Sequence, residues 1–143
     1  MVAYLDSSVV LRHILLGDIS IRHVFALETV VSSELLEIEC VRVLHRYRLN
    51  RDLDDDGLLV ANDRLRAVIE GITLLAMTHE VKARAMGAFP VTVKTLDALH
   101  LSTALVYSDH YLASEEGEIL LLFSHDDAMN RCTRALGFSA PFA

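Results

Sequence analysis

Short apolar runs alternate along this chain with longer segments in which apolar residues recur at helical spacing. The apolar runs are VAYL at residues 2–5, TVV at 29–31, ITLLAM at 72–77 and ILLLF at 119–123. Each has the length of a strand rather than of a helix, and successive apolar positions are typical of parallel strands buried on both faces. The sequence therefore predicts four strands in a mainly parallel sheet.

Helical patterns fill the segments between the predicted strands. The predicted helices lie at residues 7–17, 19–27, 34–48, 53–69, 78–86, 95–107 and 125–137. Side-chain oxygens are expected to cap four of them, from Ser7 or Ser8, Ser32 or Ser33, Thr78 and Thr95. Gly17 and Gly137 are expected to end the first and the last helix, because glycine adopts the left-handed conformation that follows many helices.

Strands that alternate with helices, without a linker or an internal repeat, are typical of an α/β domain. We expect one domain, residues 1–143, in which a central, mainly parallel sheet of four to five strands is flanked by helices in a three-layer arrangement. In such folds ligands bind at the carboxyl ends of the strands, where the connections diverge. Asp6 follows the first predicted strand and Asp126 the last, so we expect both aspartates at one edge of the sheet.

The helix at residues 34–48 carries three glutamates, and its helical phase separates two of them. The neighbours of Glu39 at i−4, i−3 and i+4 are Leu35, Leu36 and Val43, all apolar. Glu37 has a serine and a glutamate at the first two of these offsets. Glu39 is therefore expected on the buried side of the helix, where a charge is normally paired or bound to a ligand. An ion pair with Arg42 or Arg46 is the alternative explanation.

Asp97, Asp126 and Asp127 lie in the first turns of two predicted helices. The helix dipole and the free N–H groups favour a carboxylate there, so helix capping is the alternative to a functional role. Capping is less favoured for Asp97, because Thr95 offers a capping oxygen two residues earlier. For Asp127 it is the favoured explanation.

Four carboxylates that converge would repel one another and raise one another's pKa. A divalent cation would compensate their charge, and a set of oxygen ligands suits Mg²⁺ or Mn²⁺ better than Zn²⁺. Such a cation beside a phosphodiester can polarise the phosphate and activate a water. The sequence therefore predicts a metal-dependent phosphoryl hydrolase. The expected metal ligands are Asp6, Asp97 and Asp126, with Glu39 bound directly or through water.

Four motifs follow one another along the chain. They are YLDSSVVLR at 4–12, SSELLEIECVRVL at 32–44, TLDALHLSTAL at 95–105 and LLFSHDDAMNRCTRALGF at 121–138. In this order and at these distances they resemble the PIN-domain family, and most of all the VapC-type ribonuclease toxins of bacterial toxin–antitoxin pairs. The resemblance covers essentially the whole chain.

The resemblance implies roles for individual residues. It places the four acids of the family on Asp6, Glu39, Asp97 and Asp126, and its supporting hydroxyl residues on Ser8 and Ser124. The assignment of Glu39 follows from a serine six residues before it and an arginine three residues after it. The sequence HDD offers a second acid at the last position, so Asp127 could share the role of Asp126.

The activity that the resemblance implies is cleavage of RNA by an activated water with Mg²⁺ or Mn²⁺, leaving a 5′-phosphate and a 3′-hydroxyl. It also implies a cognate antitoxin, whose tail wraps the toxin, and a toxin homodimer, alone or in a toxin–antitoxin hetero-oligomer. We expect a partner helix to occupy an apolar groove around Val10, Ile14, Val24 and Phe25.

The charge balance limits how RNA could be held. The chain has a net charge of −7, from 13 Lys and Arg against 20 Asp and Glu, which excludes a nucleic-acid-binding protein with a broad basic face. A local basic segment, RVLHRYRLNR, remains at residues 42–51. Arg42 and Arg46 within it are the candidate RNA contacts.

Other features bear on location and assembly. Cys40 and Cys132 lie in apolar helical segments and are expected to be buried free thiols, consistent with a reducing cytoplasm. No apolar run approaches the roughly 18 residues of a membrane span, and the first residues lack the features of a signal peptide. A mean hydropathy of +0.36 indicates apolar surface that a partner or a second copy covers.

Two alternative functions remain open. Residues 52–63, DLDDDGLLVAND, match part of a calcium-binding EF-hand loop, although the last position is Asp63 instead of the usual glutamate. A PIN-fold RNA-processing nuclease that has no antitoxin would share every motif with the toxin. A non-catalytic member of the fold is disfavoured, because all four acids are present.

Overall fold

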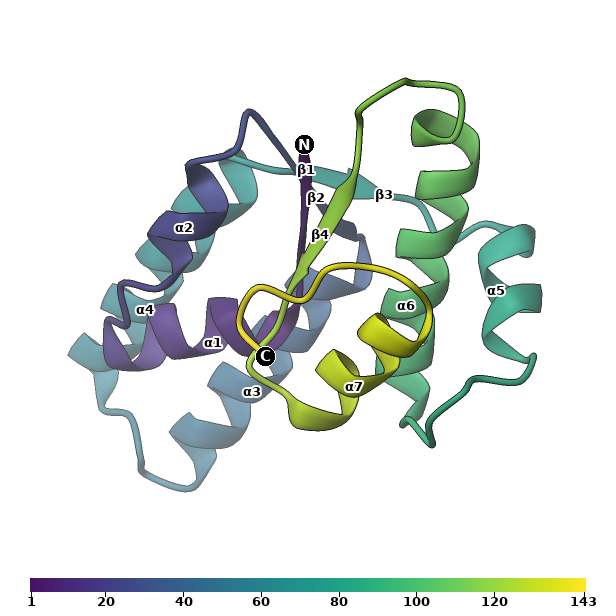
Figure 1. Ribbon diagram of the computed structural model, residues 1–143. Helices are drawn as coiled ribbons and strands as arrows, with labels where there is room; N and C mark the ends of the chain where they lie inside the picture. Colours follow the sequence, from purple (N-terminus) through teal and green to yellow (C-terminus); the bar gives the residue numbers. More distant parts are fainter.

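A computed structural model describes residues 1–143 and contains one sheet of four parallel strands (Figure 1). The strands are β1 (Val2–Leu5), β2 (Thr29–Ser33), β3 (Thr73–Leu75) and β4 (Leu120–Phe123), in the order β3-β2-β1-β4. In register, Val2 pairs with Thr29 on one side of β1 and with Leu120 on the other. The predicted parallel sheet is confirmed.

Helices cover both faces of this sheet, so the predicted three-layer α/β fold is confirmed (Figure 1). One face is covered by α1 (Ser7–Leu16), α2 (Ile21–Phe25), α3 (Leu35–Leu49) and α4 (Asp55–Glu70). The other face is covered by α6 (Thr95–Tyr107) and α7 (Asp127–Ala135), and α5 (His79–Ala85) packs against α6. A π-helical turn, Ser108–Leu112, extends α6 beyond its predicted end.

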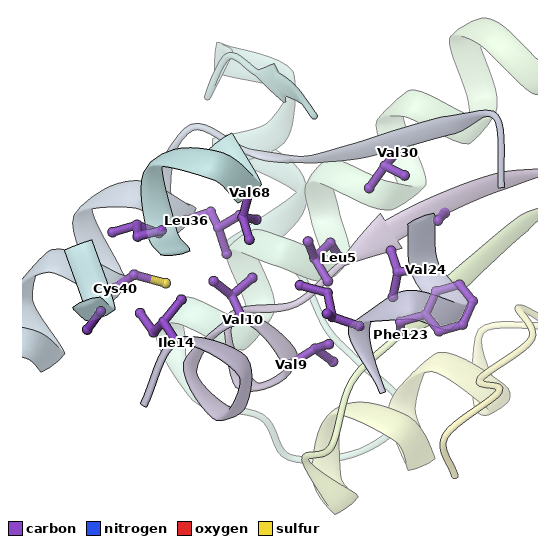
Figure 2. Close-up of a cluster of buried hydrophobic side chains, with 14 of the residues drawn as sticks. Leu5, Val9, Val10, Ile14, Val24, Val30, Leu36, Cys40, Val68 and Phe123 are labelled. Atoms are coloured by element: carbon purple, nitrogen blue, oxygen red, sulfur yellow. The ribbon is translucent and has the colours of Figure 1, made fainter. Parts of the chain in front are cut away.

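Alternate residues of the strands point into two separate hydrophobic clusters. Ala3 and Leu5 pack with α1 to α4, in the cluster drawn in Figure 2, whereas Val2 and Tyr4 pack with α6 and α7. This explains why β1 is apolar at every position, since each of its faces is buried under helices. Burial of both faces fixes the direction in which each side chain of β1 points.

Both cysteines are buried free thiols, as predicted. Cys40 belongs to the first cluster and Cys132 to the second. Burial, with the negative charges of Glu39 and Asp6 nearby, raises the pKa of Cys40 to about 12. The Cys40 thiol therefore stays protonated and unreactive at neutral pH.

The ends of the helices agree with the sequence prediction in part. Gly17 ends α1 at a φ of 70°, and the Thr78 hydroxyl caps α5 by accepting from Val81 N. Two predicted caps are wrong: neither the Ser8 hydroxyl nor that of Thr95 caps its helix. Ser8 instead bonds a carboxylate of the site described below, and Thr95 is itself the first helical residue of α6.

The calcium-binding alternative is wrong. The loop proposed at residues 52–63 is helical from Asp55 onward, because α4 begins there. Asp54 caps this helix by accepting from Gly57 N, at 2.7 Å. A helix cannot wrap its own side chains and carbonyls around one ion as an EF-hand loop does.

The prediction of an apolar partner groove around Val10, Ile14, Val24 and Phe25 is also wrong. Val10, Ile14 and Val24 are buried in the core, and only Phe25, at 39% exposure, reaches the surface. Other large apolar side chains do lie on the surface, among them Leu16, Ile19, Leu49 and Met86. No helix in the structure combines the length and the apolar character needed to cross a lipid bilayer.

The order of the strands places the point where the strand connections diverge between β1 and β4. The chain leaves β1 toward β2 on one side and returns to β4 on the other, so the connections diverge at the carboxyl ends of β1 and β4. Asp6 N donates to Phe123 O across this end of the sheet, at 3.0 Å. The residues that follow these two strands form the site described next.

Candidate active site

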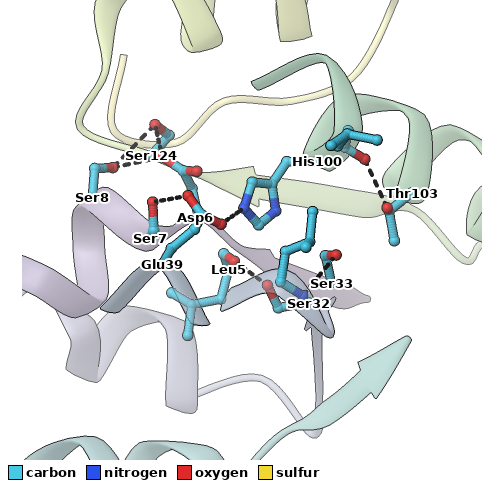
Figure 3. A network of polar contacts seen from close by, with 12 residues as sticks. Leu5, Asp6, Ser7, Ser8, Ser32, Ser33, Glu39, His100, Thr103 and Ser124 are labelled. Atoms are coloured by element: carbon cyan, nitrogen blue, oxygen red, sulfur yellow. Dashed lines mark hydrogen bonds and ion pairs between the residues drawn. The ribbon is translucent and has the colours of Figure 1, made fainter. Parts of the chain in front are cut away.

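Asp6 directly follows β1 and is only 3% exposed. Its Oδ2 atom accepts hydrogen bonds from the hydroxyls of Ser8 and Ser124, each at 2.7 Å (Figure 3). Its Oδ1 atom makes no hydrogen bond and is not sealed from solvent. The two serines therefore fix the carboxylate and leave one oxygen available to a ligand.

The same serines tie Asp6 to the turn between β4 and α7. The Ser8 hydroxyl accepts from His125 N at 2.9 Å, and the Ser124 hydroxyl accepts from Asp126 N at 3.0 Å. Each hydroxyl thus donates a hydrogen bond to Asp6 and accepts one from a backbone N–H of the turn. These hydrogen bonds join the end of β1 to the β4–α7 turn, more than a hundred residues away in the sequence.

Asp126 is exposed and caps α7, because its Oδ1 accepts from Met129 N at 2.8 Å. Asp127 is also exposed and lies in the first turn of α7 without a capping bond. The expectation that Asp127 is the capping residue is therefore wrong, and Asp126 takes that place. A cap uses one carboxylate oxygen, so the other oxygen of Asp126 remains free.

Glu39 points inward from α3, as its helical phase predicts, whereas Glu37 is exposed. The Glu39 side chain is 12% exposed and is held at both oxygens. Ser7 donates to Oε2 at 3.2 Å, and His100 Nε2 lies 2.5 Å from Oε1 (Figure 3). The alternative ion pair with Arg42 or Arg46 does not form.

His100 contacts Glu39 from α6, where the sequence alone allows either a packed residue or one that supports the metal ligands. It is fully buried in α6, and its Nδ1 lies 2.7 Å from the hydroxyl of Tyr4. Burial alone would lower the pKa of His100, but the hydrogen bond to Glu39 and the charges of Asp6 and Glu39 outweigh it and raise the pKa. The available signal was its position one turn after Asp97 in an otherwise apolar helix.

Asp97 lies in the first turn of α6, half-buried, and its carboxylate makes no hydrogen bond or ion pair. Its pKa is raised to about 6, first by burial and then by the negative charges of Asp6, Asp126 and Glu39, against a smaller opposing effect of His100. The four acids predicted from the sequence therefore share one electrostatic environment.

The donor set of this environment fits a magnesium-type cation. It consists of carboxylate oxygens, with serine hydroxyls behind them, and it lacks the thiolate and imidazole ligands that favour zinc. The unpaired, half-buried carboxylate of Asp97 is the group that a cation would compensate best. As the side chains stand, no group of three or more acids, histidines or cysteines is arranged to hold a metal ion.

Comparison with known proteins agrees with this architecture. Residues 3–132 match the PIN domain, and this stretch contains all four acids. The chain therefore belongs to the PIN-domain family, as its motifs predict.

Within this family, the chain is similar to a VapC-type ribonuclease. The chain is 31% identical over 96 residues to Ribonuclease VapC47 of Mycobacterium tuberculosis (strain CDC 1551 / Oshkosh). The aligned part makes up 61% of this chain and spans 64% of the length of that ribonuclease. The predicted resemblance to VapC-type proteins is confirmed at this level.

Proposed function

We propose that this protein is a Mg²⁺- or Mn²⁺-dependent endoribonuclease and that residues 1–143 act as one nuclease domain. The observation that carries the proposal is the half-buried, unpartnered carboxylate of Asp97 in the field of three other acids. Such a cluster costs free energy unless a cation compensates it. PIN nucleases generally depend on a divalent metal, and the relative VapC47 is a ribonuclease.

Asp6, Asp97 and Asp126 are the proposed metal ligands. Glu39 would bind directly or through a water, and Asp127 is close enough in sequence to share the role of Asp126. When bound there, Mg²⁺ or Mn²⁺ would polarise the phosphodiester and lower the pKa of a water. The roles of the remaining groups follow from the contacts of the protein itself.

Ser8 and Ser124 would orient the carboxylate of Asp6. Ser8 and Ser124 hold one oxygen of Asp6, so the other oxygen points in a fixed direction. Because the same hydroxyls accept from the backbone of the β4–α7 turn, they also fix where Asp126 begins α7. A carboxylate that is already ordered loses less entropy when it binds a ligand.

Arg42 and Arg46 are the proposed contacts to the RNA backbone. Both are exposed on α3 and make no ion pair, whereas Arg48 is bound to Asp55 at 2.5 Å. Glu39, Arg42 and Arg46 recur at helical spacing and so lie along one side of α3. The two guanidinium groups could hold phosphates beside the acids in a protein whose net charge is −7.

We further propose that the nuclease is the toxin of a toxin–antitoxin pair and forms a homodimer. The likeness to VapC47 supports the first part. Large exposed apolar side chains, such as those of Leu16, Leu49 and Met86, supply surface that a partner or a second copy would cover. An arginine of the partner could bind the acids and compete with the cation.

Purified protein incubated with structured and single-stranded RNA tests the nuclease proposal. Cleavage should require added Mg²⁺ or Mn²⁺, stop with EDTA, and leave 5′-phosphate ends. Cleavage that continues in excess chelator would contradict the metal mechanism.

Co-expression with any small gene for a DNA-binding protein that lies directly upstream tests the toxin assignment separately. The two chains should copurify, and the second should inhibit cleavage. If they do not copurify and cleavage is unaffected, the chain is an RNA-processing nuclease without an antitoxin.

A further inference from the structure

A buried chain of hydrogen bonds runs behind the acid cluster, from β1 through α6 to α3. The Tyr4 hydroxyl lies 2.7 Å from His100 Nδ1, and His100 Nε2 lies 2.5 Å from Glu39 Oε1. Tyr4 and His100 are fully buried. Figure 3 shows the His100 ring directed at Glu39, with Asp6 next to that contact.

The protons of this chain can be assigned from its chemistry. An ionised carboxylate only accepts hydrogen bonds, so Nε2 of His100 must carry a proton and donate it to Glu39. In the neutral ring Nδ1 is then an acceptor, and the Tyr4 hydroxyl donates to it. In the charged ring Nδ1 donates to the Tyr4 oxygen instead. The link from His100 to Glu39 is therefore present in both states of the ring.

The link restricts Glu39 more than any other contact. The second oxygen of Glu39 has only the longer bond from Ser7, at 3.2 Å, and no arginine pairs with this carboxylate. The ring itself cannot turn freely, because the bond to Tyr4 holds its opposite nitrogen. The Glu39 side chain has several rotatable bonds, and the hydrogen bonds from Tyr4 through His100 restrict its carboxylate to one orientation.

We propose that His100 and Tyr4 are positioning residues: Tyr4 orients the ring of His100, and His100 holds Glu39 toward the acid cluster. The proposal rests on the proposed function, since it assigns Glu39 to the binding of a divalent cation. Partners behind a ligand typically change metal affinity or activity by about 10- to 100-fold when they are removed.

Two substitutions at one position separate positioning from packing. A glutamine amide can donate from about the place of Nε2, and an asparagine amide from about the place of Nδ1. His100→Gln should keep the bond to Glu39, whereas His100→Asn should keep only the contact to Tyr4. Tyr4→Phe removes a single hydroxyl from the far end of the chain. Tyr107→Phe, near the end of the same helix, is the matched control.

The readouts are the dissociation constant for Mn²⁺, measured by electron paramagnetic resonance, and the thermal unfolding temperature of the metal-free proteins. We expect His100→Asn to weaken Mn²⁺ binding about tenfold or more, His100→Gln to bind within a few fold of wild type, and Tyr4→Phe to lie between them. Tyr107→Phe should match wild type. Changes in affinity should not follow changes in unfolding temperature.

Equal Mn²⁺ affinity in wild type, His100→Asn and His100→Gln would overturn the positioning role, as would losses that only follow unfolding temperature. Failure of the proposed function has a different signature. In that case wild-type protein itself would neither bind Mn²⁺ at the acid cluster nor cut RNA.

Discussion

The hydroxyl of Ser124 donates a hydrogen bond of 2.7 Å to Asp6 Oδ2, across 118 residues of sequence. It joins the carboxyl end of β1 to that of β4 at the point where the strand connections diverge. The same hydroxyl accepts from Asp126 N, so one serine orders two of the four acids.

Ser124→Ala should therefore reduce nuclease activity about tenfold, since it removes one of the two hydroxyls that hold Asp6 and the bond that holds Asp126 N. Its cost in the free energy of unfolding should be about 2 kcal/mol, because it removes two hydrogen bonds that each contribute about 1 kcal/mol. RNA cleavage rates and urea unfolding measure the two effects.

Ser102→Ala is the matched control for this substitution. The Ser102 hydroxyl is equally buried but has no hydrogen-bond partner, and it lies on α6. Activity should be unchanged and stability equal or higher, because an unsatisfied buried hydroxyl is removed. Similar activity losses in the two variants would show that Ser124 acts only through packing.

The two glutamates of α3 should differ sharply. Glu39→Gln removes the inward-facing charge, but the amide oxygen can still accept a hydrogen bond from His100, so the protein should stay folded. Activity should fall about tenfold or more, at least the effect expected for groups that support a metal ligand. Glu37→Gln changes an exposed side chain and should do little. Cleavage rates at limiting Mn²⁺ compare them, and equal losses would mean that Glu39 has no special role.

The acids at the start of α7 offer a similar comparison. Asparagine caps a helix as well as aspartate does, so Asp126→Asn should change stability by less than about 1 kcal/mol. Activity should nevertheless fall, because the charge beside Asp97 is lost. Asp127→Asn should cost less. Greater sensitivity at Asp127 in the cleavage assay would move the fourth acid by one residue.

Asp97 predicts how the stability of the metal-free protein depends on pH. Its pKa is about 6 in the folded protein and about 3.9 in an unfolded chain, so the folded state binds more protons between these values. The free energy of unfolding should consequently fall as pH rises from about 4 to about 6.

Asp97→Asn removes this effect. At pH 7.5 the unfolding temperature of the metal-free variant should be higher than that of wild type by about a few degrees. The difference should vanish near pH 4. Asp127→Asn should show no such trend. A constant difference at all pH values would mean that Asp97 does not carry the raised pKa.

The sequence predicted the fold and the four acids because both depend on local patterns. Apolar runs identified the strands, and helical phase distinguished Glu39 from Glu37. What it missed depends on contacts between distant segments. The bond from Ser124 to Asp6 spans 118 residues, and only the resemblance, not the local pattern, pointed to Ser124 as a supporting residue. Thr95 was assigned as a cap by its position beside a helix, yet it lies inside α6.

The role of His100 also needed the folded structure. A lone histidine in an apolar helix must find a hydrogen-bonding partner, but the sequence does not say which one. Its partners come from β1 and α3, which lie far from α6 in the sequence. Likewise, Val10, Ile14 and Val24 have the pattern of a helix-binding groove, and α3 and α4 already cover that face.

Direct binding of Mn²⁺ to wild-type protein and to the double variant Asp6→Asn, Asp97→Asn, measured by isothermal titration calorimetry, tests the central claim most directly. The account predicts saturable binding to the wild type that is lost in the folded double variant. Equal binding by both proteins, or none by a wild type that still cuts RNA, would contradict a cation held by this acid cluster.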